Sequence, residues 1–132
     1  CSFTTKDPIV ILTGDLAFFY DRNAFWHNYP MNNLRIVLLN NHAGGIFRLI
    51  DGPARQPELE EFFETNQSLS AKNLAAEFNM EYHLVEKEDE LNIALNHFFG
   101  ASPFPKILEI KTESPKNAEI LKWVKSQVQN LL

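Results

Sequence analysis

The chain has 132 residues, of which 45% are hydrophobic and 22% are charged. This is the size and mixture of one ordinary globular domain, and it excludes the collagen-like, disordered and disulfide-rich classes. With 17 acidic and 12 basic residues, the net charge is −5, so the chain lacks the basic surface that nucleic-acid binding requires. Its longest apolar runs fall well short of the roughly 20 residues that span a bilayer. We therefore expect no nucleic-acid partner and no membrane span.

The beginning of the chain bears on its location and completeness. Cys1 is the single cysteine, so no internal disulfide is possible, and no charged-then-apolar leader precedes it. Both observations predict a cytoplasmic location. Because the sequence opens with Cys rather than Met and enters a strand-like run within a few residues, we expect it to be a piece of a longer protein.

The first part of the chain predicts two buried strands joined by a helix. Residues 9–13 form a short β-branched apolar run between Pro8 and Gly14, and residues 34–39 form a second such run. Residues 16–29 have the length of a crossover helix. Their aromatic side chains spread round more than one face, which predicts a largely buried helix.

The second part alternates helices and strands. Apolar residues at helical spacing predict a helix over 71–78, capped by Ser68 or Ser70, and another over 88–98. Strands are predicted over 82–85 and 106–110. A last helix begins at Ser114-Pro115, and its apolar stripe consists of Ile120, Val124, Val128 and Leu131.

Alternating strands and helices predict the α/β class. Right-handed βαβ units would build a doubly wound, mostly parallel sheet with helices on both faces. We expect residues 1–132 to form a single domain. The irregular stretch 44–69, with a short helix near 58–63, is long for a connection inside a compact domain, and such stretches are usually functional.

Polar residues follow both of the first two strands. In an open α/β sheet, ligands bind beyond the carboxyl ends of the strands, and there Gly14-Asp15 and Asn40-Asn41 place a carboxylate and a carboxamide. Oxygen ligands suit Mg²⁺, which one or two such groups hold together with substrate phosphates. Gly14 allows close approach of the backbone, and the helix opening at Leu16 directs N–H groups at an anion. Each pair alone is more typical of an ordinary turn or cap, whereas the two together, followed by Gly44-Gly45, favour a site and ordinary turns about equally.

These residues also carry a resemblance to a family. Gly14-Asp15-Leu16 and Asn40-Asn41 resemble the thiamine-diphosphate motif, Gly-Asp-Gly followed at a distance by Asn-Asn, with Leu16 replacing the third glycine. The run Gly-Asp-Leu-Ala-Phe-Phe-Tyr-Asp and the run Leu-Asn-Asn-His-Ala-Gly-Gly-Ile-Phe resemble one branch, the 2-succinyl-5-enolpyruvyl-6-hydroxy-3-cyclohexene-1-carboxylate synthases of menaquinone biosynthesis. The resemblance extends through the whole chain and corresponds to the carboxyl-terminal, diphosphate-binding domain without its opening segment.

The resemblance implies a site for thiamine diphosphate and Mg²⁺ or Mn²⁺. Its metal ligands would be Asp15, the side chain of Asn41 and the carbonyl of Ala43, completed by diphosphate oxygens and a water. Ile46 and Phe47 would line an apolar pocket beside the thiazolium ring. The full implied set of cofactor-binding residues is Gly14, Asp15, Leu16, Ala17, Asn41, Ala43, Gly44, Gly45, Ile46 and Phe47.

The resemblance also implies an activity and partners. The whole enzyme decarboxylates 2-oxoglutarate and adds the succinyl unit to isochorismate, and Arg48, or less favourably Arg55, would meet a substrate carboxylate. In this family the glutamate that activates the cofactor belongs to the amino-terminal domain of the partner subunit, which no segment here resembles. We therefore expect no catalytic residue in this chain and no activity from it alone. Its partners would be the remaining domains of the enzyme and a second subunit, in a homodimer or homotetramer.

Two other interpretations stay open. Another thiamine-diphosphate enzyme, of the acetolactate-synthase or decarboxylase type, would keep the cofactor and change the reaction, although the run from Gly44 to Phe47 favours the menaquinone branch. A stand-alone receiver-like α/β module would use Asp15 as a regulatory acid. A receiver carries an acidic cluster after its first strand, whereas Asp15 stands alone there, and Lys111 is the one candidate for its lysine.

The histidines receive no ligand role. His42 adjoins a predicted metal ligand, but imidazole is a poor partner for Mg²⁺, and we expect its side chain to face away. His27, His83 and His97 have no Cys or His at zinc-site spacing.

Overall fold

A four-stranded parallel sheet is the central element of the computed structural model, which describes residues 4–129. Its strands lie in the order β1-β2-β4-β3. The predicted α/β class with a parallel sheet is confirmed. The elements are β1 (Ile9–Gly14), α1 (Asp15–Tyr20), β2 (Leu34–Asn40), α2 (Ala71–Glu77), β3 (Glu81–Val85), α3 (Glu88–Phe99), β4 (Lys106–Lys111) and α4 (Ser114–Gln129).

The chain divides into two compact units. The sheet unit comprises the residues through Asn40 together with Leu69–Lys111, and therefore contains every strand named above and α1, α2 and α3. The loop unit comprises Asn41–Ser68 and the residues from Thr112 onward, including α4. Whether residues 1–132 act as a single domain stays a prediction.

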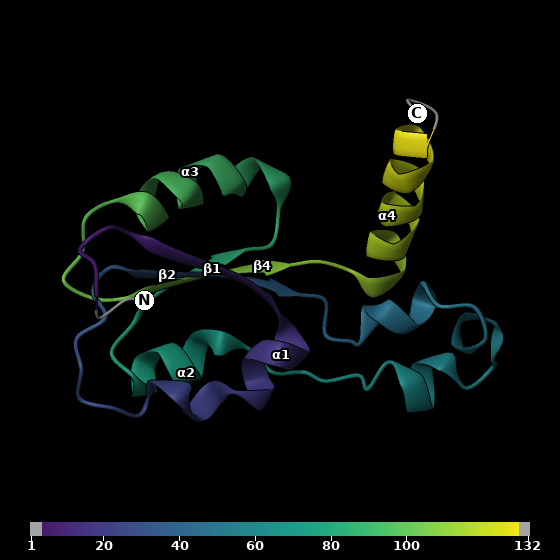
Figure 1. Cartoon of the computed structure of the whole chain (residues 1–132), viewed down its shortest axis with the longest axis horizontal. Coiled ribbons are helices and arrows are strands. Elements are labelled where there is room, and N and C mark those ends of the chain that lie inside the picture. Colours follow the sequence, from purple (N-terminus) through teal and green to yellow (C-terminus); the bar gives the residue numbers. More distant parts are fainter. Residues whose placement is uncertain (1–3, 130–132) are drawn as a thin grey trace. The chain divides into compact units, whose positions relative to one another are not determined.

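Helices cover both faces of the sheet in the sheet unit. Figure 1 shows α3 on one face and α1 and α2 on the other. Side chains alternate along each strand, so each face receives its own apolar cluster. The cluster on the α1 and α2 side consists of Phe18, Leu34, Ile36, Leu38, Ala71, Leu74, Ala75, Met80 and Ile107, and the cluster on the α3 side is built on Val85, Phe98 and Leu108.

The predicted helix over 16–29 is wrong in both length and burial. α1 ends at Tyr20, and a 3₁₀ turn at Arg22–Phe25 follows it. Asp21 precedes the turn, and Asp21 and Asn23 are short polar residues that favour local hydrogen bonding over a continuing helix. Tyr20 and Trp26 are 82% and 83% exposed. Aromatic residues on every side of this segment therefore did not mean that every side is buried.

The other predicted elements begin and end within about one residue of their observed positions. Ser70, not Ser68, caps α2, since its Oγ accepts a hydrogen bond from the N–H of Lys72 at 3.3 Å. The short helix predicted near 58–63 is a single π-helical turn, Leu59–Phe63.

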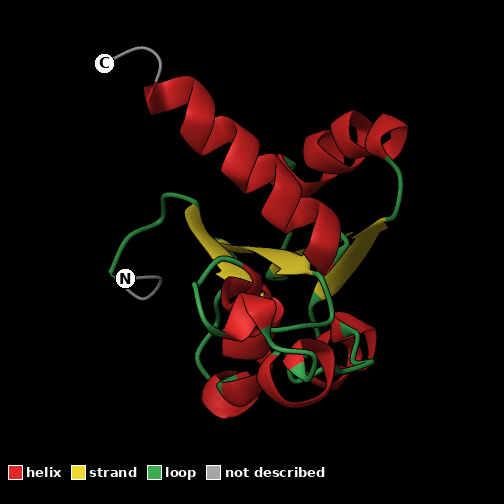
Figure 2. Cartoon of the chain, turned by 90° about the vertical axis from the view of Figure 1, so that its right-hand side faces the viewer, coloured by secondary structure: helices red, strands yellow, loops and turns green. Residues whose placement is uncertain are grey.

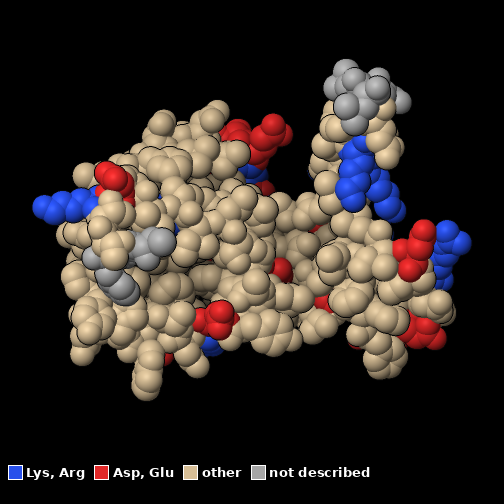
Figure 3. All heavy atoms as spheres, viewed as in Figure 1, with Lys and Arg blue, Asp and Glu red and all other residues tan. Residues whose placement is uncertain are grey.

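Helix α4 is a long helix of the loop unit (Figure 2). Its predicted apolar stripe is largely exposed, because Ile120, Val124 and Val128 are between 41% and 52% accessible. Leu131, the last member of that stripe, lies outside the described residues. Lysine side chains also lie along this helix (Figure 3). Within residues 4–129, no helix combines the length and the apolar character that a bilayer crossing needs.

Candidate functional site

The ends of β1 and β2 bring the two motif segments to one edge of the sheet. In the parallel register, Gly14 is opposite Leu39, so Asp15 and Asn40 leave neighbouring strands at the same, carboxyl edge. Asn40 is the last residue of the sheet unit here, and Asn41 opens the loop unit. Neighbouring parallel strands with a common carboxyl edge are the arrangement that the sequence predicted.

Asp15 is a buried carboxylate in the first turn of α1, where the helix dipole favours a negative charge. It is 3% exposed. Leu16 and Ala17 follow it, and first-turn N–H groups have no carbonyl partner within their own helix. Gly14 has φ −86°, which any residue adopts, and a Cβ there would meet no atom within 4 Å. Packing within the protein therefore does not explain this glycine.

The segment after β2 presents two oxygens. Asn41 Oδ1 accepts a hydrogen bond from the N–H of Ala43 at 3.1 Å, and the carbonyl of Ala43 accepts one from the N–H of Gly45 at 2.9 Å. Between them, His42 has a left-handed backbone with φ 58°, and its carbonyl accepts from the N–H of Gln67 at 3.0 Å. Asn41 Oδ1 and the carbonyl oxygen of Ala43 each have a second lone pair that these hydrogen bonds do not use.

Gly45 of the loop unit lies in narrow space. A Cβ on Gly45 would lie 2.9 Å from Asn41 Nδ2 and 3.2 Å from Ser114 Oγ, so a side chain there would displace the Asn41 amide. The N–H of Gly44 donates to the carbonyl of Glu64. Glycine at position 45 therefore allows the Asn41 amide to keep its position.

Two predicted pocket residues, Ile46 and Phe47, lie in the 3₁₀ turn Gly45–Arg48. Ile46 is 60% exposed, and the Phe47 ring packs against Phe63 with centroids 5.8 Å apart. The turn thus leaves one apolar side chain accessible and holds the other within the loop unit.

Arg48 is bound by two carboxylates of its own unit. Its Nε and Nη2 donate to the two oxygens of buried Glu64, each at 2.7 Å, and Nη2 also donates to Glu60 at 2.7 Å. These hydrogen bonds, that to Glu60 first, raise the pKa of Arg48. A substrate carboxylate would compete with this bidentate pair. Arg55 forms an exposed pair with Asp51, and contact of either arginine with substrate stays a prediction.

A cluster that the sequence did not predict surrounds Glu109 at the same edge of the sheet unit. We call Asn40, Ser70, Ala71, Tyr82 and Glu109 the Glu109 cluster, because the Glu109 carboxylate accepts a hydrogen bond from each of the others. Burial, opposed by Ser70 and assisted by Glu109, raises the pKa of Tyr82 to about 12. The available signal was a lone glutamate within an apolar strand, since strands of a parallel sheet are covered on both faces.

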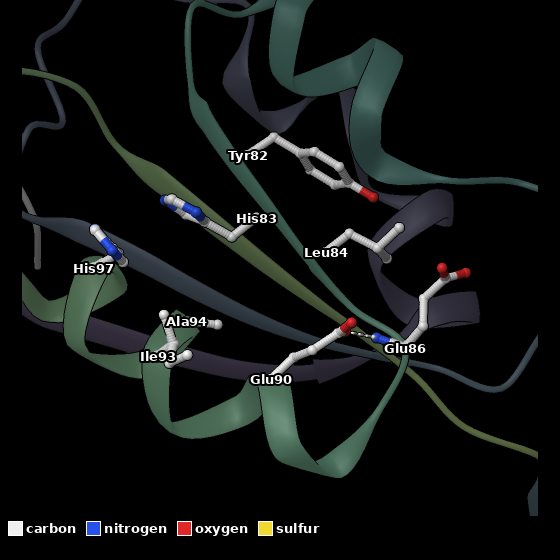
Figure 4. A pocket seen from close by; sticks show the side chains of 8 residues that line it. All are labelled: Tyr82, His83, Leu84, Glu86, Glu90, Ile93, Ala94 and His97. Atoms are coloured by element: carbon white, nitrogen blue, oxygen red, sulfur yellow. Dashed lines mark hydrogen bonds between the residues drawn. The ribbon is translucent and has the colours of Figure 1, made fainter.

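A separate hollow of about 470 Å³ lies in the sheet unit between β3 and α3 (Figure 4). The rings of His83 and His97 stack there at 6.3 Å, and Glu90 accepts a hydrogen bond from the N–H of Glu86. Burial, then Lys106, lowers the pKa of His83. Across the described residues, no three His, Cys, Asp or Glu side chains gather as a metal cluster, so this hollow offers two imidazoles without a complete ligand set.

No protein-family profile matches the chain. It is 59% identical over 125 residues to the 2-succinyl-5-enolpyruvyl-6-hydroxy-3-cyclohexene-1-carboxylate synthase of Cytophaga hutchinsonii, a match that covers 95% of this chain and 22% of that protein. The synthase of the same name from Christiangramia forsetii is 42% identical over 120 residues, which cover 91% of this chain and 21% of that protein. The chain thus spans about a fifth of the length of these curated relatives, and the predicted resemblance to their family is confirmed.

Proposed function

We propose that this chain, which is homologous along nearly all of its length to a segment of the 2-succinyl-5-enolpyruvyl-6-hydroxy-3-cyclohexene-1-carboxylate synthases, is part of such an enzyme and binds the metal-diphosphate end of thiamine diphosphate. The whole enzyme would decarboxylate 2-oxoglutarate and transfer the succinyl unit to isochorismate in the cytoplasm. The remaining domains of the enzyme and a second subunit would complete the site.

The observation that carries the proposal is an oxygen-only set of ligands after two neighbouring parallel strands. Asp15 follows β1 as a buried carboxylate, and Asn41 Oδ1 and the carbonyl of Ala43 follow β2 with lone pairs to spare. A carboxylate, a carboxamide and a backbone carbonyl are hard ligands that suit Mg²⁺ or Mn²⁺. The chemistry of these residues therefore fits the metal that the family implies.

The neighbouring backbone fits a diphosphate. Leu16 and Ala17 lie in the first turn of α1, whose N–H groups favour an anion. The open space at Gly14 leaves room for close approach of a bound group. In the loop unit, Gly45 leaves room for the Asn41 amide beside the backbone.

The described residues bind and orient in this proposal rather than catalyse. When bound, thiamine diphosphate supplies the electron-accepting chemistry of the decarboxylation. Asp15, Asn41 and Ala43 would hold its metal, and Ile46 and Phe47 would exclude water beside its ring. We propose that the chain alone is inactive, because the activating glutamate would come from another domain.

The test is the substitution Asp15→Ala in the complete synthase. We expect binding of thiamine diphosphate in the presence of Mg²⁺ to weaken by roughly a thousandfold, about 4 kcal/mol, because the one charged ligand is lost. Titration followed by intrinsic tryptophan fluorescence measures the affinity, and circular dichroism checks the fold. Asp21→Ala is the matched control, since Asp21 lies just after α1 and is exposed. Unchanged affinity in Asp15→Ala would remove the metal assignment.

A further inference from the structure

Glu109 is a fully buried carboxylate whose described partners are all hydrogen-bond donors. It is 0% exposed in the middle of β4. Its Oε1 accepts from Asn40 Nδ2 at 2.7 Å, and its Oε2 accepts from Tyr82 Oη at 2.7 Å. The hydroxyl of Ser70 and the N–H of Ala71 also donate to Oε2, each at 2.9 Å. Donors on every side suit an ionised carboxylate, which can only accept.

Three of these donors, from Asn40, Ser70 and Ala71, flank the two ends of the segment that leaves the sheet unit. Asn40 is the last residue of β2 before the loop unit begins, and the chain returns at Leu69. The second amide hydrogen of Asn40 bonds the carbonyl of Leu69 at 3.0 Å. The backbone that leaves the sheet unit at Asn40 and the backbone that returns at Leu69 are thus hydrogen-bonded to each other. Asn40, Ser70 and Ala71 also bond both of them to the Glu109 carboxylate.

Such a cluster is costly to build for stability alone. A buried carboxylate is tolerated only while its hydrogen bonds are made, and an apolar residue would fill the same space without that requirement. The carboxylate provides directional hydrogen bonds that an apolar residue cannot make. These bonds fix the positions of β2, α2 and β3 relative to β4.

We propose that Glu109 is a positioning residue for the metal end of the site proposed above, and the inference rests on that proposed function. Glu109 fixes the Asn40 side chain and the Leu69–Ala71 backbone, and thereby the end of β2 from which Asn41 extends. Both amide hydrogens of Asn40 are used within the sheet unit, which fixes the orientation of its side chain. Partners that orient metal ligands from behind typically change metal affinity by about 10–100-fold when removed.

The experiment compares four variants of the complete synthase: Glu109→Gln, Tyr82→Phe, Asn41→Ala and the control Glu81→Gln. At saturating thiamine diphosphate, the Mg²⁺ midpoint of the tryptophan fluorescence titration is expected to rise about tenfold or more in Glu109→Gln, with kcat at saturating Mg²⁺ changed far less. Tyr82→Phe removes one donor and keeps the carboxylate, so a smaller rise of about twofold to threefold is expected. It keeps the test usable if Glu109→Gln does not fold.

The matched control is Glu81→Gln. Glu81 is also a partly buried carboxylate of the sheet, bonded to Ser102 and paired with Lys106, but it begins β3 and lies at the opposite edge. Its replacement should leave the Mg²⁺ midpoint unchanged. Hydrogen exchange measured by mass spectrometry gives a second readout, and we expect faster exchange over residues 69–71 in Glu109→Gln and not in Glu81→Gln.

The outcomes separate this inference from the proposed function. If Asn41→Ala weakens metal binding while Glu109→Gln and Tyr82→Phe leave the midpoint unchanged, the proposed function stands and Glu109 is structural. Glu109→Gln could also speed hydrogen exchange over residues 69–71 without changing the Mg²⁺ midpoint. In that case the hydrogen bonds of Glu109 hold the segment but do not position Asn41, and the inference is overturned. If Asn41→Ala has no effect, both the metal site and the positioning role fall.

Discussion

The strands of a parallel sheet begin at one side, the amino edge, and end at the other, the carboxyl edge. Both edges bury charged side chains here, but the buried charges are positive at the amino edge and negative at the carboxyl edge. At the amino edge, Arg35 and Lys106 are 5% and 4% exposed and lie directly opposite each other on β2 and β4. At the carboxyl edge the buried polar groups are Asp15, Asn40 and Glu109. One edge therefore concentrates cations, and the other concentrates carboxylates and an amide.

The amino edge satisfies its cations entirely within the sheet unit. Arg35 donates to the carbonyls of Phe98 at 2.9 Å and Gly100 at 3.2 Å, and Lys106 donates to the carbonyl of His97 at 2.7 Å. All three carbonyls lie at the carboxyl end of α3, where the helix dipole favours positive charge. Two like charges on neighbouring strands are tolerated because a helix end faces both and because Glu81 forms an ion pair with Lys106 at 3.3 Å.

The difference between the two edges shows how one sheet can use buried charge for stability at one edge and for ligand binding at the other. The amino edge is closed by the protein's own carbonyls, whereas at the carboxyl edge Asn41 and Ala43 follow β2 with acceptor capacity to spare. Buried charge therefore serves packing at one edge, and in the proposed function it serves a metal at the other. Variants at the two edges should separate in the same way.

The largest expected effect on this comparison is that of Arg35→Met. The variant keeps the apolar stem but leaves the carbonyls at the end of α3 without their donor, so the free energy of unfolding should fall by about 3 kcal/mol. Cofactor affinity should stay within about twofold of wild type, since the change is at the amino edge. Urea denaturation and the fluorescence titration measure the two quantities.

Arg22→Met provides the control for Arg35→Met. Arg22 forms an exposed pair with Glu77 at 3.5 Å, and such pairs contribute at most about 1 kcal/mol. A loss of cofactor affinity in Arg35→Met without a loss of stability would contradict the assignment of stability to the amino edge and of binding to the carboxyl edge.

The next effect separates the two adjacent asparagines at the carboxyl edge. Asn41→Ala should weaken cofactor binding roughly a hundredfold through loss of a metal ligand, with little change in stability. Asn40→Ala should weaken it about tenfold or less and instead lower the free energy of unfolding by about 2 kcal/mol, because Glu109 loses a donor and Leu69 loses its partner. Side-by-side titrations and denaturation curves are the measurement, and equal losses of affinity would show that the assignment of ligand and anchor is wrong.

The smallest effect concerns pH at the carboxyl edge. The pKa of Tyr82 is about 12 in the folded chain, against an ordinary value of 10.0. Between these values the unfolded chain releases a proton that the folded chain retains, so this group lowers stability as the pH rises from about 10 to about 12. Tyr82→Phe should therefore show a shallower alkaline decline, measured by urea denaturation at increasing pH. Tyr20→Phe, at an exposed tyrosine, should keep the wild-type slope, and an equally steep decline in Tyr82→Phe would contradict the assignment.

Much of the fold could be predicted because its signals are local. β1 and β2 contain β-branched apolar runs bounded by Pro, Gly or Asn, and α3 has acidic residues at its start and regular apolar spacing. The segment 16–29 failed because its signal was ambiguous. Phe18 enters the core while Tyr20 and Trp26 remain exposed, and composition cannot distinguish these aromatic residues.

The candidate site was predictable only where a short motif carries it. Asp15 and Asn41 stand next to strand ends that the pattern located, and the parallel register brings those ends to one edge. The Glu109 cluster was missed because its members come from β2, β3, β4 and the start of α2. Their meeting depends on strand order, which pairs β4 with both β2 and β3, and no spacing along the chain reveals it.

That strand order also determines when the edge can be completed during synthesis. β4 is the last of the described strands to leave the ribosome, yet it lies between β2 and β3. Until it arrives, two earlier strands lack their shared neighbour and expose apolar faces, a state prone to aggregation. Because the same strand carries Glu109, the two ends of the segment 41–68 can bond to this carboxylate only after β4 has been synthesised. A nascent chain that ends before β4 would therefore be prone to aggregation. It would also lack the Glu109 hydrogen bonds that fix the carboxyl edge of the sheet.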